Sequence, residues 1–210
     1  MAKREYNNDY PSVTTVLGVL RKIALENWFK FTPLKQIQEE SERGKQIGTE
    51  IHEAIHNYIE TGKTKIETEY AEEVMLALKS FILFRQEHPE ITLRNAEIAL
   101  TSERYRYNGT LDCEGQREGS LLILDWKVTR AKKEDTPPIY DEYKYQVAAY
   151  RYLYEEVKKT EIRKAIIIVL AKDKIAYTFY ELNEEELAGC FEEVFLPALR
   201  IYNYQHKKEV

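Results

Sequence analysis

The chain has 210 residues, of which 43% are hydrophobic and 32% charged, and its formal net charge is −5. These proportions exclude a disordered chain and predict one folded domain over residues 1–210. The acidic balance excludes a surface coated with basic side chains, so any phosphate-binding region must be a local groove.

Further classes of protein are excluded by what the sequence lacks. It contains no apolar run long enough to cross a membrane, and its first ten residues lack the apolar core of a secretory signal. Two cysteines, Cys113 and Cys190, are too few for a disulfide scaffold or for ligation of an iron–sulfur cluster. We therefore expect a reducing, intracellular and cytoplasmic location and no membrane partner.

Residues 1–90 are predicted to form a helical section. Ser12 or Thr14 is a suitable N-cap for a helix that continues towards Phe31. We expect Trp28, Phe29 and Phe31 to pack in the core, with stacking on nucleic-acid bases as the alternative.

Two more helices are predicted in this section, over 39–61 with an end at Gly62 and over 69–87. Gly48 lies one turn before His52, so another backbone or a metal site could approach the helix closely there.

The segment His52-Glu53-Ala54-Ile55-His56 also matches the H-E-x-x-H pattern of zinc proteases. On a helix the two histidines would lie one turn apart and could share a zinc ion, with Glu53 as the base. A downstream glutamate ligand is possible only from Glu69, Glu72 or Glu73, and no further signature supports it, but a zinc hydrolase remains an alternative.

Residues 91–182 are predicted to form a catalytic sheet and a bridging helix. After a strand over 96–102, which carries Glu97, residues 109–127 read as a hairpin with its turn at Glu118-Gly119. Counting outward from this turn places Asp112 opposite Asp125, with their Cβ atoms about 5 Å apart. Two buried carboxylates repel each other at that separation, and a bound Mg²⁺ or Mn²⁺ would remove the conflict.

Lys127 shares a strand face with Asp125, because side chains alternate along a strand. Its ammonium group could orient a water molecule or stabilise negative charge on a phosphate. Lys127, Arg130, Lys132 and Lys133 form the densest short basic cluster in the chain, which makes them candidate phosphate contacts.

The remaining elements complete the fold. A helix starting at Pro137-Pro138 is expected to carry Gln146 and Tyr150, followed by strands over 166–170 and 175–182. Residues 183–210 are predicted to form a C-terminal helix that Pro197 kinks. The order of elements predicts an α/β (α+β) fold, with a mixed sheet of about five strands flanked by helices.

Four segments together resemble the motifs of a known family. These are Gly109-Thr110-Leu111-Asp112, Asp125-Trp126-Lys127, Gln146-Val147-Ala148-Ala149-Tyr150 and the pair Gly48 and His52. They resemble the G-x-x-D, D/E-x-K, Q-h-x-x-Y and histidine motifs of PD-(D/E)XK nucleases of the RecB-like branch. From residue 11 to about 155 the pattern is similar to the mitochondrial genome maintenance exonuclease group.

The resemblance implies a restriction-endonuclease-like core and a role for each matching residue. His52, Asp112, Asp125 and the backbone carbonyl of Trp126 would bind Mg²⁺ or Mn²⁺, and Asp112, Asp125 and Lys127 would be catalytic. Gln146 and Tyr150 would brace the site and touch DNA, Thr129 would hold a phosphate, and Glu97 would support the metal ligands.

The implied activity is hydrolysis of phosphodiester bonds, with single-stranded DNA as the partner, degraded from an end in repair, recombination or replication. The iron–sulfur variants of the family need four cysteines, so no cluster is expected here. Besides the zinc hydrolase, a non-catalytic nucleic-acid-binding module remains open as an alternative.

Overall fold

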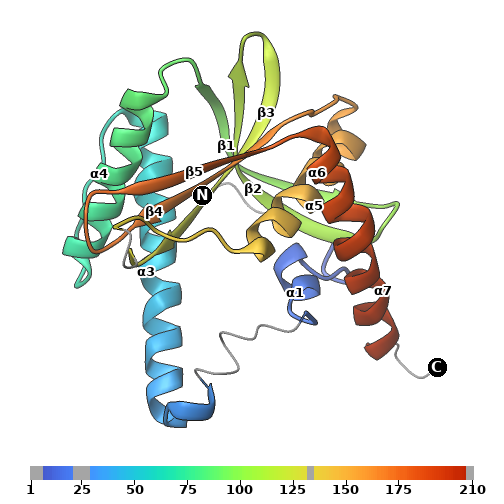
Figure 1. The fold of residues 1–210 in the computed structure, drawn as a ribbon, viewed down its shortest axis with the longest axis horizontal. Helices are drawn as coiled ribbons and strands as arrows, with labels where there is room; N and C mark the ends of the chain where they lie inside the picture. The colour runs from blue at the N-terminus through green and yellow to red at the C-terminus, as the bar shows by residue number, and fades with distance from the viewer. Residues whose placement is uncertain (1–6, 21–28, 132–134, 207–210) are drawn as a thin grey trace.

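The computed structural model describes residues 7–20, 29–131 and 135–206. A five-stranded mixed sheet forms its centre, in the order β1-β2-β3-β4-β5, which confirms the predicted sheet (Figure 1). The strands are β1 Thr92–Ser102, β2 Tyr107–Arg117, β3 Ser120–Thr129, β4 Ala165–Ala171 and β5 Tyr177–Leu182. Only β3 and β4 run parallel, and the other neighbouring strands are antiparallel.

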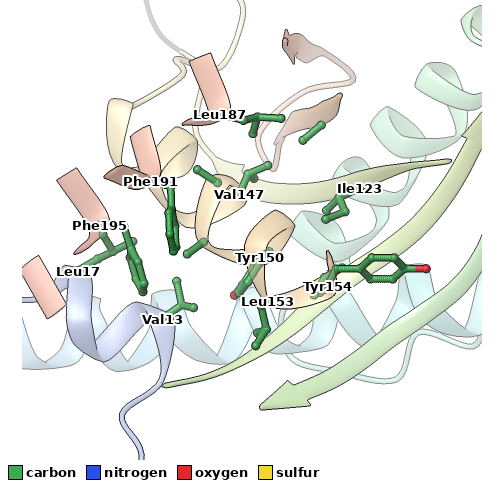
Figure 2. Packing of buried hydrophobic residues seen from close by; sticks show 14 of the residues in the cluster. Val13, Leu17, Ile123, Val147, Tyr150, Leu153, Tyr154, Leu187, Phe191 and Phe195 are labelled. Carbon is green, nitrogen blue, oxygen red and sulfur yellow. The ribbon is translucent and has the colours of Figure 1, made fainter. Parts of the chain in front are cut away.

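Helices cover both faces of this sheet. The described helices are α1 Val13–Leu17, α3 Leu34–Thr61, α4 Ala71–Glu87, α5 Asp141–Lys158, α6 Glu184–Gly189, the π-helix η1 Cys190–Phe195 and α7 Leu196–Gln205. One hydrophobic cluster joins one face of the sheet to α1, α5 and the C-terminal helices, and Figure 2 shows its packing. A second cluster joins the other face to α3 and α4. None of the helices that the structure describes is long and apolar enough to span a membrane.

The hairpin between β2 and β3 has the predicted two-residue turn. Glu118 and Gly119 both have positive φ angles, 51° and 80°, as a type I′ turn requires. This turn sets the pairing of Arg117 with Ser120 and, further along, of Cys113 with Leu124, as expected. The hairpin makes β3 the central strand of the sheet, buried on both faces.

The helices confirm some predicted limits and correct others. Helix α3 ends at Gly62, which adopts the expected left-handed conformation with φ 69°. Helix α5 begins at Asp141 rather than at Pro137-Pro138, because the chain before it is extended and the Thr178 hydroxyl donates to the Pro137 carbonyl. Ser12 caps α1 as predicted, but α1 ends at Leu17 instead of continuing.

The expectation that Phe29 and Phe31 lie in the core is wrong. They are 48% and 86% exposed. They precede the first turns of α3, where the helix extends beyond the sheet (Figure 1). Of the α3 residues before Ile47, only Ile37 is buried. Trp28 lies outside the described residues, as do the two candidate phosphate contacts Lys132 and Lys133.

The C-terminal segment is helical as predicted, but it is divided. Asn183 caps α6 in a capping box with Glu186. The π-helix η1 follows and leads into α7, where Pro197 lies in the first turn. Proline has no N–H for the helical ladder, and a wider turn before it relieves the clash with the preceding carbonyl.

Gly109 allows close packing of α5 on β2. A Cβ atom at this position would lie 2.8 Å from side-chain atoms of both Leu153 and Tyr150. We expect Gly109→Ala to lower the free energy of unfolding by about 1–3 kcal/mol, because the added methyl group overpacks the core. Urea denaturation measures this change.

Gly189→Ala is the matched control, since a Cβ atom there meets nothing within 4 Å and the backbone is helical. Its stability should be unchanged or higher by up to about 1 kcal/mol. Equal effects of the two substitutions would contradict the packing argument.

Candidate active site

The site lies where β2 and β3 separate. The regular ladder between them ends at the pair of Cys113 and Leu124. Asp112 and Asp125 are therefore not a regular cross-strand pair, which corrects the predicted opposition. Instead, the Asp112 carboxylate accepts a hydrogen bond from the Trp126 amide at 2.9 Å. Both aspartates are buried, with 7% and 1% of their surface exposed.

Strand β2 turns at Asp112. Leu111 belongs to the cluster on the α5 side of the sheet, whereas Cys113 belongs to the cluster on the α3 and α4 side. Residues two apart share a face in a regular strand, so the strand must rotate between these two positions. Each remains paired with β1, through Ile98 and Ala96 respectively.

Glu97 occupies the matching position on β1, between Ala96 and Ile98. Its φ angle is 55°, a left-handed conformation that a glutamate rarely adopts. The register of β1 also shifts between Leu93 and Ala96. These distortions bring the Glu97 carboxylate to Asp112, consistent with the tendency of bulges near active sites to redirect side chains.

His52, Glu97 and Asp112 form a group of potential metal ligands, with one ligand atom from each lying within 4.8 Å of the others. His52 comes from α3, and its Nδ1 lies 3.3 Å from Asp112 Oδ1. Burial acts to lower the pKa of His52, but the Asp112 carboxylate outweighs it and the pKa is raised. Burial acts to raise the pKa of Asp112, yet His52 and Lys127 hold that pKa below its usual value.

Asp125 and Lys127 form a buried ion pair beside this group. Lys127 Nζ lies 2.6 Å from Asp125 Oδ2, and also 5.9 Å from the centre of the Tyr143 ring on α5. Burial and, less strongly, the Asp112 carboxylate raise the pKa of Asp125 to about 6 despite Lys127. Burial alone would lower the pKa of Lys127, but Asp125 and Asp112 raise it.

These residues fit a divalent cation. Among the described residues, no hydrogen-bond donor other than the Lys127 ammonium reaches the buried Asp125 carboxylate. A buried and unpaired carboxylate oxygen has lost its hydrating water and gained no other partner. A hard divalent cation would supply that partner. His52, Glu97 and Asp112 would hold such an ion, whereas Asp125 lies outside this group of close ligand atoms, and its part as a ligand, like that of the Trp126 carbonyl, stays a prediction.

Gln146 and Tyr150 contact each other on α5, and their predicted part in bracing the site stays a prediction. Gln146 Nε2 donates to the Tyr150 hydroxyl at 2.7 Å, one turn apart. Tyr150 is only 5% exposed and packs in the α5-side cluster (Figure 2), which leaves its ring no surface for a base. The half-buried Gln146 remains the candidate for contact with DNA.

Thr129 and Arg130 lie at the end of β3. Thr129 shares the face of Asp125 and Lys127 by strand alternation, and its carbonyl accepts the Lys172 amide. Arg130, the next residue, is exposed. Their predicted contacts with phosphate stay predictions.

The zinc interpretation of His52, Glu53 and His56 lacks support from the geometry. Within the part of the chain that the structure describes, the one group of three or more potential ligands contains His52 but neither His56 nor Glu53. Glu53 is exposed on the helix surface. His52 instead faces the aspartates, so the arrangement favours a site built on carboxylates.

A protein-family model matches most of the sequence that forms this site. The model of the PD-(D/E)XK nuclease superfamily matches residues 24–207. The chain belongs to the PD-(D/E)XK nuclease superfamily. Membership implies a nucleic-acid substrate and hydrolysis of its backbone. No curated protein matches the sequence significantly.

Solved structures of exonucleases resemble this superfamily member. A proposed exonuclease from Eubacterium rectale is 15% identical with a TM-score of 0.50, over 78% of this chain and 69% of that one. The alkaline exonuclease of Laribacter hongkongensis is 10% identical with a TM-score of 0.40, over 93% and 92%. At 15% identity the likeness to the Eubacterium rectale structure concerns the fold alone.

Two residues lie closer to the candidate site than the sequence analysis indicated. Glu97 is one of the potential metal ligands. Its position in the sequence also fits an incidental charge at a strand edge. Tyr143 was not predicted at all, yet its ring covers Lys127. Its spacing of three residues before Gln146 places both on one face of α5, which was the available signal.

We expect Glu97→Gln to weaken binding of Mn²⁺ by roughly tenfold, because one anionic oxygen near the ion becomes a neutral amide. Isothermal titration of the purified protein measures the change. Glu118→Gln is the matched control, since Glu118 also has a positive φ but lies at the distant hairpin turn. Equal affinities of the two variants would remove Glu97 from the ligand set.

Proposed function

We propose that this protein is a divalent-metal-dependent nuclease that degrades single-stranded DNA from an end, as in the mitochondrial genome maintenance exonuclease group. One observation carries the proposal. A lysine ammonium lies 2.6 Å from a buried aspartate, beside a second aspartate that a histidine and a backbone amide hold in place. These groups can hold a divalent cation and stabilise negative charge, which supports hydrolysis of a phosphodiester.

A bound Mg²⁺ or Mn²⁺ would activate the attacking water and neutralise charge on the phosphate. The protein groups then have separate parts. Asp112 and Asp125 provide the anionic oxygens that hold the ion, and His52 keeps Asp112 ionised. Lys127 stabilises the negative charge that develops on the phosphate oxygens as water adds and the ester oxygen leaves.

The environment of Lys127 supports a catalytic part rather than a simple ion pair. Its side chain is only 18% exposed, so the ammonium group is largely desolvated. The Tyr143 ring limits its movement on the α5 side. A positive charge held in place in a low-dielectric site stabilises a transition state more than a mobile one does.

Preference for a single strand and for an end follows from the resemblance and from charge. The chain carries a net charge of −5, which disfavours broad contact with a duplex. A narrow groove that leads one strand past the acidic site is compatible with that charge. Processing of single strands in repair, recombination or replication would require this activity.

Lys127→Met should lower cleavage of end-labelled single-stranded DNA at least a hundredfold, because the positive charge is lost at the reacting phosphate. Lys144→Met, a neighbouring lysine paired with Asp141, serves as the control and should cleave normally. Cleavage in both proteins should need Mg²⁺ or Mn²⁺ and stop with a chelator. Undiminished cleavage by the Lys127 variant would reject the proposed chemistry.

The requirement for a free strand end is tested by comparing a linear single strand with a circular single strand of the same sequence. A linear single strand should be degraded to short products, whereas the same sequence closed into a circle should persist. A duplex of that sequence should be cut more slowly than the linear strand. Equal digestion of circle and linear strand would make the enzyme an endonuclease.

A further inference from the structure

A second cluster of positive charge lies at one end of the sheet, away from Lys127. Lys172 follows the last residue of β4, and its amide donates to the Thr129 carbonyl at 3.0 Å. This bond places Lys172 beside Arg130, which follows β3. Among the described residues, neither Lys172 nor Arg130 takes part in an ion pair.

Arg43 completes the cluster from α3. It forms an ion pair with Glu73, and its guanidinium lies 5.2 Å from the centre of the Tyr70 ring. Burial lowers the pKa of Lys172, and the nearby Arg130 and Arg43 lower it further. The acidic neighbours Glu73 and Asp173 act in the opposite direction but less strongly. Arg130 and Arg43 therefore lie close enough to Lys172 for their charges to act on its ammonium group.

The surface of α3 connects this cluster with the metal ligands. Gly44, Gly48 and His52 follow one another at intervals of one turn and so share a face of the helix. A Cβ atom at Gly44 or at Gly48 would meet nothing within 4 Å. A glycine inside a helix is less favourable than alanine, and packing within the protein does not explain either of them.

The distance from the acidic site to the positive cluster can be compared along α3 and along β3. From His52 back to Arg43, α3 advances roughly 13 Å. From Asp125 to Arg130, β3 advances roughly 16 Å. The distance between the cluster and the acidic site is therefore similar along α3 and along β3. On α3, Gly44 and Gly48 lie between them.

We propose that Arg43, Arg130 and Lys172 bind a backbone phosphate of the strand being cleaved, a few nucleotides from the reacting bond. The strand then crosses α3 at Gly44 and Gly48, where its sugar–phosphate backbone approaches the helix closely. The inference rests on the proposed function, because it places the substrate of that same site.

Lys172→Met tests the cluster, since methionine retains the apolar stem and removes the charge. Binding of fluorescent oligothymidylates is measured in the Lys127→Met background with Mg²⁺. We expect about tenfold weaker binding. The slope of log affinity against log salt concentration should fall by about 0.7. The penalty should appear only for strands long enough to reach from the acidic site to the cluster.

Lys164→Met is the control, because Lys164 precedes the opposite end of β4 and pairs with Glu181. It should bind as the parent protein does. If Lys172→Met also binds with parental affinity and salt slope, the inference is overturned while the proposed function stands. If the parent binds no strand and the unaltered protein cuts none, both fail together.

Gly48→Leu tests whether the strand crosses α3 at Gly48, because the larger side chain would block the close approach. Leucine favours the helix and has open space, so the urea midpoint should be equal or higher, while binding of the strand should weaken at least fivefold. Thr49→Leu, on an exposed neighbouring position, should leave binding unchanged. Parental binding by Gly48→Leu would exclude the path across α3.

Discussion

Two neighbouring buried carboxylates, on Asp112 and Asp125, constrain the structure of this nuclease. Lys127 and His52 lie beside them, yet burial keeps the pKa of Asp125 raised. A protein core tolerates such a pair when a cation can join it. The sheet and the helices around the site hold these two carboxylates in place until the cation and the substrate bind.

The sheet and the helices divide this task. The Asp112 carboxylate replaces the missing ladder contact by accepting the Trp126 amide, so β2 and β3 separate without leaving that group unpaired. Helix α3 brings His52 from one face of the sheet, and α5 places Tyr143 over Lys127 from the other. Groups anchored on packed elements lose little freedom when a substrate binds, which favours catalysis.

Features set by local rules could be predicted from the sequence. The Glu118-Gly119 turn and strand alternation predicted the hairpin register, and Gly62 predicted the end of α3. The left-handed Glu97 and the rotation of β2 at Asp112 could not be predicted, because they arise where three strands meet. The exposure of Phe31 was also missed, since it depends on α3 extending beyond the sheet. Motif spacing made Asp125 and Lys127 candidates but did not include Tyr143, whose one signal was its position three residues before Gln146.

The metal-dependent gain in stability tests the central claim most directly. Urea unfolding is measured with saturating Mn²⁺ and with chelator for the unaltered protein, Asp125→Asn and Lys127→Met. Binding to the folded state alone should add about 2.7 kcal/mol at a hundred times the dissociation constant. The account predicts this gain in the unaltered protein and in Lys127→Met, and its loss in Asp125→Asn. An equal gain in Asp125→Asn would show that the buried acids do not hold the ion.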